Sequence, residues 1–376
     1  MVPEPNRLPS GPAGEALRDL IEASGGWLPF DRFMHHALYA PQWGYYATPR
    51  RLIGQGPSDG SDFVTAPELS SAFAKTLARA VAQWLSHTGV DEIWEFGAGR
   101  GVLARDLLNA LDVLGSGPKQ GKVKRYVLVE VSGALQQVQS ETLRDHAAVV
   151  EWAQAWPEQL HAVVLGNEVL DAMPVQLLAR QQGAWFERGV SLEGDALVWR
   201  DRPTELRPPC PIAGEHDYVT EIHPQAQAWV GDLATRLRSG VVALVDYGFP
   251  EAEYYHVQRS SGTVMCHQGH RSDANPLDQV GEKDITAHVD FTGIALAAQA
   301  ANLGVVGYTS QGSFLLDAGM VDVLSTLSMA EQAAALKLIH EHEMGELFKV
   351  MVLAPQAQAA TVPAVGFVRG DRTHTL

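Results

Sequence analysis

Cysteine, long apolar runs and targeting signals are scarce or missing in this sequence. The two cysteines, Cys210 and Cys266, stand far apart and match no metal-binding or redox spacing, which excludes a disulfide scaffold and favours a reducing compartment. No stretch approaches the roughly 18 apolar residues that cross a bilayer. Residues 1–5 resemble neither a secretory signal nor a transit helix. We therefore expect a cytoplasmic protein without a membrane segment.

Positive charge is scarce as well. The 376 residues carry 28 Lys plus Arg against 44 Asp plus Glu, which gives a net charge of −16. Such a field repels a phosphate backbone and attracts cations, so we expect no nucleic-acid partner. An acidic surface that serves solubility alone is the other interpretation. With 46% hydrophobic residues, the chain can bury a large core in one enlarged domain or two.

Three glycines spaced two residues apart follow an apolar stretch. Residues 93–96 have the character of a buried strand, and Gly97, Gly99 and Gly101 lead from it into a helical pattern. In such a turn, N–H groups at the helix N-terminus meet a ligand, and glycine lets the backbone come close. The further glycine of a dinucleotide site is missing, and an acid, Glu95, precedes the turn. The pattern favours a cationic cofactor without pyrophosphate, such as S-adenosylmethionine; an ordinary glycine turn is the alternative.

A second apolar strand, at residues 125–130, ends in Glu130. In a doubly wound sheet, the acid at this position accepts hydrogen bonds from the cofactor ribose. Glu130 lies 29 residues beyond Gly101, whereas the usual spacing is about 20, so we interpret residues 115–121 as an insertion. An acid at a strand end without any role is the alternative.

A third strand, at residues 162–167, runs into a polar cluster of Asn167, Glu168 and Asp171. Ligands of parallel α/β sheets lie outside the carboxyl ends of the strands, so these side chains should lie beside the reactive end of the cofactor. Two carboxylates three residues apart can both reach one guanidinium or ammonium group. This cluster is the best catalytic candidate. The alternative is that an acid here caps the N-terminus of a helix and interacts favourably with the helix dipole.

The remaining pattern predicts an open, doubly wound, mostly parallel α/β sheet, because apolar runs alternate with helical ones. We divide the chain into an N-terminal helical extension over residues 1–90, a sheet domain over 91–360 and a tail over 361–376. The sheet domain carries a β-rich insertion at 176–235 and a long polar loop at 249–283, interpreted as a lid or a disordered segment. The expected strands cover residues 92–96, 125–130, 148–150, 162–167, 241–247, 305–308 and 347–353.

Smaller motifs add detail to this plan. Thr65 and Glu68 have the spacing of a capping box that opens a helix. His267 and His270 have no third ligand at a recognisable spacing, so we expect no metal site. Asp290 stands near the start of a further helix.

The order of these motifs resembles that of class I methyltransferases. An acid and three alternating glycines after the first strand, with an acid after the second, are the signature of that class, met here by residues 95–101 and Glu130. More narrowly, five motifs in order look like the MidA family, over about residues 30 to 355. These motifs are residues 43–46, 62–68, 167–175, 246–248 and 284–291.

The resemblance implies a Rossmann-like class I methyltransferase fold with S-adenosylmethionine as cofactor. Glu95 and the glycine loop would hold the amino-acid half of the cofactor, and Glu130 would hold its ribose. Thr65, with Tyr45 or Tyr46, would close over the bound cofactor. We therefore expect the cofactor site to combine the sheet with the N-terminal extension.

The resemblance also implies an acceptor. Mitochondrial members of the MidA family are complex I assembly factors that symmetrically dimethylate an arginine of a complex I subunit, so a protein arginine becomes the expected target. Glu168 and Asp171, with Asn167, would orient the guanidinium and accept its proton. The secondary candidates for substrate binding are Asp246, Tyr247, His288 and Asp290.

Other functions stay open at this point. The insertion and the long loop could shape a closed pocket for a small molecule, or for another protein residue, as readily as a peptide groove. A methyltransferase-like assembly factor that does no chemistry is a third hypothesis, and a nicotinamide dehydrogenase is disfavoured by the missing glycine. The oligomeric state and a link to respiratory-complex assembly are likewise open.

Overall fold

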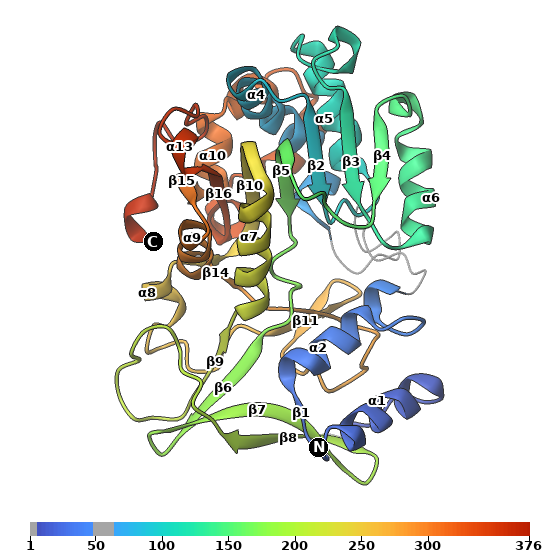
Figure 1. The fold of residues 1–376 in the computed structure, drawn as a ribbon, viewed down its shortest axis with the longest axis vertical. Helices are drawn as coiled ribbons and strands as arrows, with labels where there is room; N and C mark the ends of the chain where they lie inside the picture. The colour runs from blue at the N-terminus through green and yellow to red at the C-terminus, as the bar shows by residue number, and fades with distance from the viewer. Residues whose placement is uncertain (1–5, 48–63) are drawn as a thin grey trace.

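The computed structural model describes residues 6–47 and 64–376. The serine- and glycine-rich stretch before residue 60 and the first two residues of the 62–68 motif lie outside the described residues. The described chain forms two lobes, one above the other (Figure 1). The sheet lobe is built on an eight-stranded sheet, and the second lobe on a five-stranded sheet with a small three-stranded sheet beside it.

The large sheet has the predicted doubly wound, mostly parallel arrangement. Its order is β15-β16-β10-β5-β2-β3-β4, with β14 paired to β10. The strands from β4 to β10 are parallel, β16 is antiparallel to both of its neighbours, and β15 closes the edge. The strands are β2 (Glu92–Phe96), β3 (Arg125–Val129), β4 (Val150–Ala153), β5 (Leu160–Asn167), β10 (Leu237–Phe249), β14 (Val289–Asp290), β15 (Leu303–Ser310) and β16 (Phe348–Pro355).

Helices cover both faces of this sheet, which is why its central strands are continuous apolar runs. One face packs against α4, α5 and the helices before β16, and the other packs against α7 and α9. α6 lies beside β4 at the edge (Figure 1). The helices are α4 (Ser71–Thr88), α5 (Val102–Val113), η3 (Pro118–Gln120), α6 (Gly133–Thr142), η4 (Arg144–His146), α7 (Pro224–Arg236), α9 (Phe291–Ala300), α10 (Gln311–Asp317), α11 (Met320–Leu324), α12 (Met329–Leu336) and η5 (Glu341–Gly345).

The helix expected to begin at a capping box is interrupted. Thr65 is the N-cap of the short α3 (Ala66–Leu69) but makes no capping bond through its side chain within the described residues. Ser70 has extended backbone and caps α4, its Oγ accepting the N–H of Ala72 at 3.3 Å. Thr65 is therefore the N-cap of a helix, as predicted, but the predicted capping bond is not formed in the described part of the chain, and the long helix starts only after Ser70. Residues 328–331 also have the spacing of a capping box, and there Ser328 and Glu331 form it at the start of α12.

The second lobe joins the N-terminal helices to the β-rich insertion. β7 and β8 form the hairpin that the alternating pattern of residues 185–190 and 196–199 predicts, β6 pairs with the other edge of β7 over part of its length, and β1 from the N-terminal segment also pairs with β7. α1 and α2 pack on this sheet around Leu28, Phe33 and Val190, all buried. The elements are α1 (Pro12–Ala23), β1 (Leu28–Pro29), α2 (Phe30–Tyr39), η1 (Tyr45–Ala47), β6 (Gln176–Gln181), β7 (Ala184–Glu193), β8 (Ala196–Pro203) and β9 (Tyr218–Ile222).

The long polar segment at 249–283 has secondary structure of its own. It carries α8 (Glu251–Tyr254), β11 (Met265–Gln268) and β12 (Arg271–Asp273), and β11 pairs with β13 (Asp284–Thr286). Glu221 of β9, fully buried, anchors it by accepting the N–H of Thr263 at 2.7 Å and the hydroxyl of Tyr254 at 2.9 Å. β11 and β12 therefore belong to the second lobe, whereas α8 lies against α9 of the sheet lobe, with the N–H of Glu251 donating to Oγ1 of Thr292 at 2.8 Å.

The last residues pack back onto the sheet lobe. After α13 (Gln356–Ala359), Phe367 packs against Phe314 with the rings tilted and their centroids 5.3 Å apart. Arg372, just before η6 (Thr373–Thr375), makes a two-bond ion pair with Glu346 at 2.5 and 3.0 Å. The tail thereby covers one end of the sheet, next to β15 (Figure 1).

Candidate active site

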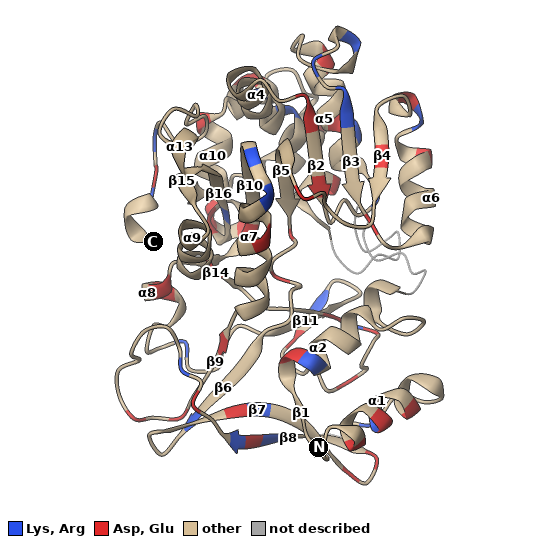
Figure 2. Cartoon of the chain, viewed as in Figure 1, with Lys and Arg blue, Asp and Glu red and all other residues tan. Residues whose placement is uncertain are grey.

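The carboxyl ends of the parallel strands meet where the two lobes face each other (Figure 1). β2 runs into the glycine loop, β3 is followed by Glu130, β5 ends at Asn167, and β10 carries Asp246 and Tyr247 near its end. Red segments at the lower ends of the central strands mark acidic residues there (Figure 2). The fold thus brings together the motifs that the sequence placed after separate strands, as expected for a parallel sheet.

The glycine loop needs its glycines for conformation and for space. Gly97, Gly99 and Gly101 have φ values of 65°, 51° and 80°, a region that side chains disfavour. A Cβ on Gly97 would lie 2.8 Å from Cγ2 of Val169. Gly101 is the N-cap of α5 and has no side chain to satisfy the first N–H groups of that helix. Those groups are the donors that bind an anionic part of a ligand.

Glu130 is tied to the glycine loop through Gln139 of α6, which the sequence analysis missed. One Glu130 oxygen accepts the N–H of Ser132 at 2.8 Å, and the other accepts Nε2 of Gln139 at 3.2 Å. The same nitrogen donates to the carbonyl of Gly99 at 2.9 Å, while the Trp152 indole donates to Oε1 of Gln139 at 2.8 Å. Burial raises the pKa of Glu130. The sequence feature that could have revealed this role is the amide side chain of Gln139 on the buried face of α6.

Glu95 lies beneath the loop, within the helix-covered face of the sheet. Its side chain is 2% exposed and accepts the hydroxyl of Tyr126 at 2.6 Å. Burial raises the pKa of Glu95 to about 7, and the Tyr126 bond partly opposes that rise. Its expected contact with the amino-acid half of the cofactor stays a prediction.

Glu168 follows the last residue of β5 in a strained conformation. Its φ of 54° is uncommon for a residue other than glycine, and such strain is concentrated at functional sites. Its N–H donates to the carbonyl of Val245 at 2.8 Å, which continues the ladder between β5 and β10. Its carboxylate accepts Nδ2 of Asn167 at 3.0 Å and the N–H of Ala66 from α3. Burial and the neighbouring Asp171 raise the pKa of Glu168 to about 8.

Asp171 and Asp246 form the rear of the site. Oδ2 of Asp246 accepts three consecutive N–H groups, from Val169 (3.1 Å), Leu170 (2.9 Å) and Asp171 (3.3 Å), so this carboxylate shapes the turn after β5. Asp171 accepts the hydroxyl of Tyr247, and burial raises its pKa to about 6. Burial and the charges of Asp171 and Glu168 also raise the pKa of Asp246, while its N–H donors oppose that rise.

The second lobe supplies a further carboxylate and two tyrosines. The hydroxyl of Tyr46 donates to Oδ1 of Asp284 at 2.8 Å, and Asp284 is 4% exposed. The ring of Tyr39 stacks on Tyr46, with centroids 5.5 Å apart, and its hydroxyl donates to the carbonyl of Ala172 at 2.9 Å. Tyr45 is fully buried in the core of the second lobe. Asp284 belongs to a motif noted in the sequence, but no role was assigned to it there.

The secondary candidates divide into two groups. Asp290 is the N-cap of α9, accepting the N–H of Gly293 at 3.1 Å, and burial raises its pKa to about 6. The ring of His288 meets those of Tyr247 and Phe249 at 5.2 and 5.1 Å. Burial lowers the pKa of His288 to about 4, so the ring is neutral at pH 7. His288 therefore borders the site through Tyr247, whereas Asp290 supports a helix.

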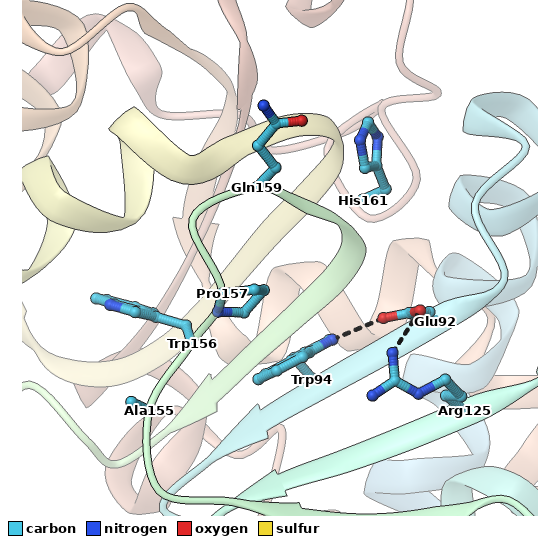
Figure 3. A pocket seen from close by; sticks show the side chains of 8 residues that line it. All are labelled: Glu92, Trp94, Arg125, Ala155, Trp156, Pro157, Gln159 and His161. Carbon is cyan, nitrogen blue, oxygen red and sulfur yellow. Dashed lines mark hydrogen bonds and ion pairs between the residues drawn. The ribbon is translucent and has the colours of Figure 1, made fainter.

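A cavity of about 360 Å³ opens elsewhere on the sheet lobe (Figure 3). Glu92 sits in it between the Trp94 indole at 3.0 Å and the Arg125 guanidinium at 2.8 Å (Figure 3). Because Glu92 and Arg125 begin their strands, this part of the cavity lies away from the candidate site. Its lining consists of Glu92, Trp94, Arg125, Ala155, Trp156, Pro157, Gln159 and His161.

Membrane-spanning helices and metal-binding clusters are both absent from residues 6–47 and 64–376. No helix in these ranges is long and apolar enough to cross a membrane. The same ranges contain no group of three or more His, Cys, Asp or Glu side chains that could hold a metal ion.

Known proteins similar to this chain share its site region. A family described as "Putative S-adenosyl-L-methionine-dependent methyltransferase" matches residues 76–309, more than half of the chain. A Burkholderia thailandensis protein crystallised with S-adenosyl-homocysteine is 45% identical, with a TM-score of 0.89, over 96% of both chains. A native crystal structure from the same organism is 44% identical, with a TM-score of 0.86, also over 96% of both chains.

Curated relatives are more distant. The protein arginine methyltransferase NDUFAF7 homolog of Drosophila melanogaster is 27% identical, covering 95% of this chain and 89% of its own. The human protein arginine methyltransferase NDUFAF7 is 26% identical, covering 94% and 85%. Both are named mitochondrial, as are the Xenopus tropicalis and mouse relatives.

These names contradict the expected cytoplasmic location. The expectation relied on scarce cysteines and short apolar runs, which do not separate the cytoplasm from the reducing interior of an organelle. The fold, the glycine loop and the relatives, one of them holding S-adenosyl-homocysteine, agree with one another. The chain therefore belongs to the MidA family of class I S-adenosylmethionine-dependent methyltransferases.

Proposed function

We propose that this protein transfers a methyl group to an arginine side chain of another protein. The observation that carries the proposal is the pair Glu168 and Asp171, which lies beyond the end of β5 beside the glycine loop. Two carboxylates suit a guanidinium, whose N–H groups form a planar fork. The names of the curated relatives, which are protein arginine methyltransferases, support the same acceptor.

The residues present fit the cofactor of the family. The turn at Gly97 has no room for a Cβ, and the open N–H groups at the start of α5 would hold the carboxylate of S-adenosylmethionine. Glu130, fixed by Gln139, would accept hydrogen bonds from its ribose. Thr65 would lie over the bound cofactor from α3. When bound, S-adenosylmethionine supplies an electrophilic methyl group on a positive sulfur.

The residues of this chain would then have to offset two positive charges and accept one proton. An arginine guanidinium has a pKa of about 12.5 or more, so it arrives charged beside a second cation. Asp171 and Glu168 would offset these charges and orient the attacking nitrogen. As the N–C bond forms and the C–S bond breaks toward sulfur, that nitrogen loses one proton. Glu168, strained and partly buried, would accept it.

Labelled methyl transfer tests the proposal. Purified protein is mixed with methyl-labelled S-adenosylmethionine and a lysate from cells lacking this chain, and the labelled proteins are hydrolysed for amino-acid analysis. Wild type is expected to produce methylarginine, and Glu168→Gln, which keeps the shape but not the charge, should lose most of the label. Glu158→Gln, a change at an exposed site, is the control. Label in lysine or in a small molecule, or equal labelling by both variants, contradicts the proposal.

The acceptor's identity is a finer proposal that rests on the family resemblance. We infer a respiratory-chain subunit as the target, with symmetric dimethylation of one arginine. Mass spectrometry of respiratory complexes from cells with and without the gene tests this inference. An arginine that loses two methyl groups on deletion supports it, and unchanged arginines in those complexes reject it.

A further inference from the structure

Asp246 is a carboxylate whose oxygens are engaged by the protein's own backbone. It is 1% exposed and follows Val245, the residue that pairs with Asn167 at the end of β5. Its Oδ2 accepts the three consecutive N–H groups of residues 169–171, and its Oδ1 accepts the N–H of Tyr247 at 2.9 Å. These oxygens are therefore already supplied with donors from the chain itself, which argues against the contact with substrate that the sequence suggested.

The turn that Asp246 holds begins with Glu168, whose φ is 54°. The chain is fixed on both sides of this residue. Its own N–H donates to the carbonyl of Val245 at 2.8 Å, and the next N–H, that of Val169, donates to Asp246 at 3.1 Å. A positive φ on a residue with a side chain persists only where the surrounding structure over-determines it. Three N–H groups that converge on one oxygen supply that constraint, because a relaxed turn would leave them without their acceptor.

The same turn packs directly on the glycine loop. A Cβ added to Gly97 would lie 2.8 Å from Cγ2 of Val169 and 4.0 Å from the carbonyl oxygen of Glu168. A Cβ added to Gly166 would lie 3.8 Å from Cγ2 of Val169. Val169, whose N–H is held by Asp246, therefore fills the space between the end of β5 and the loop. The turn that carries Glu168 is thus fixed against the loop that is expected to hold the cofactor.

We propose that Asp246 is a positioning residue for methyl transfer, which aligns Glu168 with the glycine loop by fixing the backbone of residues 168–171. This inference rests on the proposed function. Asp246 touches neither the acceptor nor the cofactor, so it acts on the reaction through Glu168. Methyl transfer requires the reacting groups to be closely aligned, and a displacement of about 1 Å can cost roughly 100-fold in rate. A loosened turn should therefore slow the transfer step and leave the binding of acceptor and cofactor largely intact.

Two substitutions remove this support to different extents. Asp246→Asn keeps one oxygen, but its NH2 group must face a backbone N–H donor on one side or the other. Asp246→Ala removes both acceptors. The matched control is Asp112→Asn, at the far end of α5 from the glycine loop. The side chain of Asp112 is 6% exposed and also accepts a backbone N–H, that of Lys119, at 2.9 Å.

Methyl transfer is measured with labelled S-adenosylmethionine and a lysate from cells that lack this chain. Initial rates over a dilution series of the lysate separate kcat from the apparent KM for the acceptors. We expect kcat to fall about tenfold or more in Asp246→Asn and about 100-fold in Asp246→Ala, with KM within about threefold of wild type. The control should match wild type. The thermal stabilisation of both Asp246 variants by S-adenosyl-homocysteine should equal that of wild type.

A double variant separates positioning from a general loss of folded protein, which would also lower kcat. If Asp246 acts through Glu168, adding Asp246→Asn to Glu168→Gln should lower kcat no further. A smaller folded fraction would instead lower kcat by the same factor in both backgrounds. The comparison uses Asp246→Asn, so it holds even where Asp246→Ala does not fold.

Four outcomes overturn the inference. The first is kinetics of Asp246→Asn equal to those of the control, and the second is a raised KM with unchanged kcat, which would assign Asp246 to acceptor binding. The third is an equal fall in kcat in the wild-type and Glu168→Gln backgrounds, and the fourth is loss of the S-adenosyl-homocysteine response, which would make Asp246 a structural residue. If wild type labels a group other than arginine, the proposed acceptor is wrong, and the same comparison on that label still tests Asp246. Wild type that transfers no label rejects both proposals.

Discussion

At the scale of single residues, Glu168 is held in a state that costs stability. A non-glycine residue with φ near 54° costs on the order of 1–3 kcal/mol. Burial and Asp171 raise its pKa to about 8, so the ionised form is disfavoured in the free protein. The structure keeps both costs at one position at the end of β5. A residue that served packing alone would need neither the positive φ nor the raised pKa.

The raised pKa of Glu168 gives a pH dependence with a defined sign. Below about pH 8 the free enzyme holds this carboxyl protonated, and a protonated acid neither pairs with a guanidinium nor accepts its proton. We expect kcat/KM for the acceptor to rise with pH from 6 to about 8, by up to about tenfold per pH unit for one proton, and then to level. Asp171, with a pKa near 6, ionises first and does not reverse the sign.

A pH–rate profile with the lysate acceptor measures this dependence. Glu168→Gln should show low activity without the rise between pH 6 and 8. A wild-type profile that is flat or that falls over this range would contradict the assignment of Glu168 as proton acceptor.

Gly97 offers a second prediction at this scale. Gly97→Ala places a Cβ 2.8 Å from Val169 and forces alanine into a left-handed backbone, which alone costs roughly 1–2 kcal/mol. We expect the variant to lose its thermal stabilisation by S-adenosyl-homocysteine. Gly183→Ala is the matched control, because Gly183 also has positive φ but open space around it. If both variants respond equally to the ligand, the close approach at Gly97 has no part in binding.

At the scale of elements, α6 supports the cofactor loop through one side chain. Gln139→Leu would leave the Trp152 indole N–H and the Gly99 carbonyl, both partly buried, without their partner, at about 1 kcal/mol for each group. We expect a lower midpoint of thermal unfolding and weaker S-adenosyl-homocysteine binding by calorimetry. Gln137→Leu, on the exposed side of α6, is the control. Unchanged affinity in Gln139→Leu would show that the loop holds its shape alone.

Elements that depend on local sequence could be predicted, whereas the pairing between elements that are distant in the sequence could not. The strands at 92–96 and 162–167 are rich in apolar residues, and both were placed correctly because buried parallel strands have that composition. The insertion of β16 between β10 and β15 depends on pairing between distant segments, which periodicity does not encode. The sequence also did not reveal the break at Ser70, whose extended backbone separates the short helix after Thr65 from α4.

The same division applies to the candidate site. Glycines and acids after strand ends could be found because parallel strands bring their carboxyl ends to one edge. Gln139 and Asp284 escaped notice, since one lies inside a helix and the other lies in a short strand of a different lobe. Their roles follow from neighbours that are distant in sequence. The polar segment at 249–283 was also hard to interpret, because the buried Glu221 that anchors it belongs to β9.

At the scale of the whole molecule, the net charge of −16 acts on whatever approaches the junction of the lobes. An acidic protein with a carboxylate-lined site should attract a basic acceptor over distances comparable to the Debye length, about 10 Å at 0.1 M salt. We expect kcat/KM for the acceptor to fall as ionic strength rises from about 0.05 to 0.3 M, mainly through slower association. Binding of S-adenosyl-homocysteine, which has no net charge, should change little and is the internal control. An acceptor rate that is independent of salt, or that increases with it, would mean that apolar contacts rather than the acidic field bring the acceptor to Glu168.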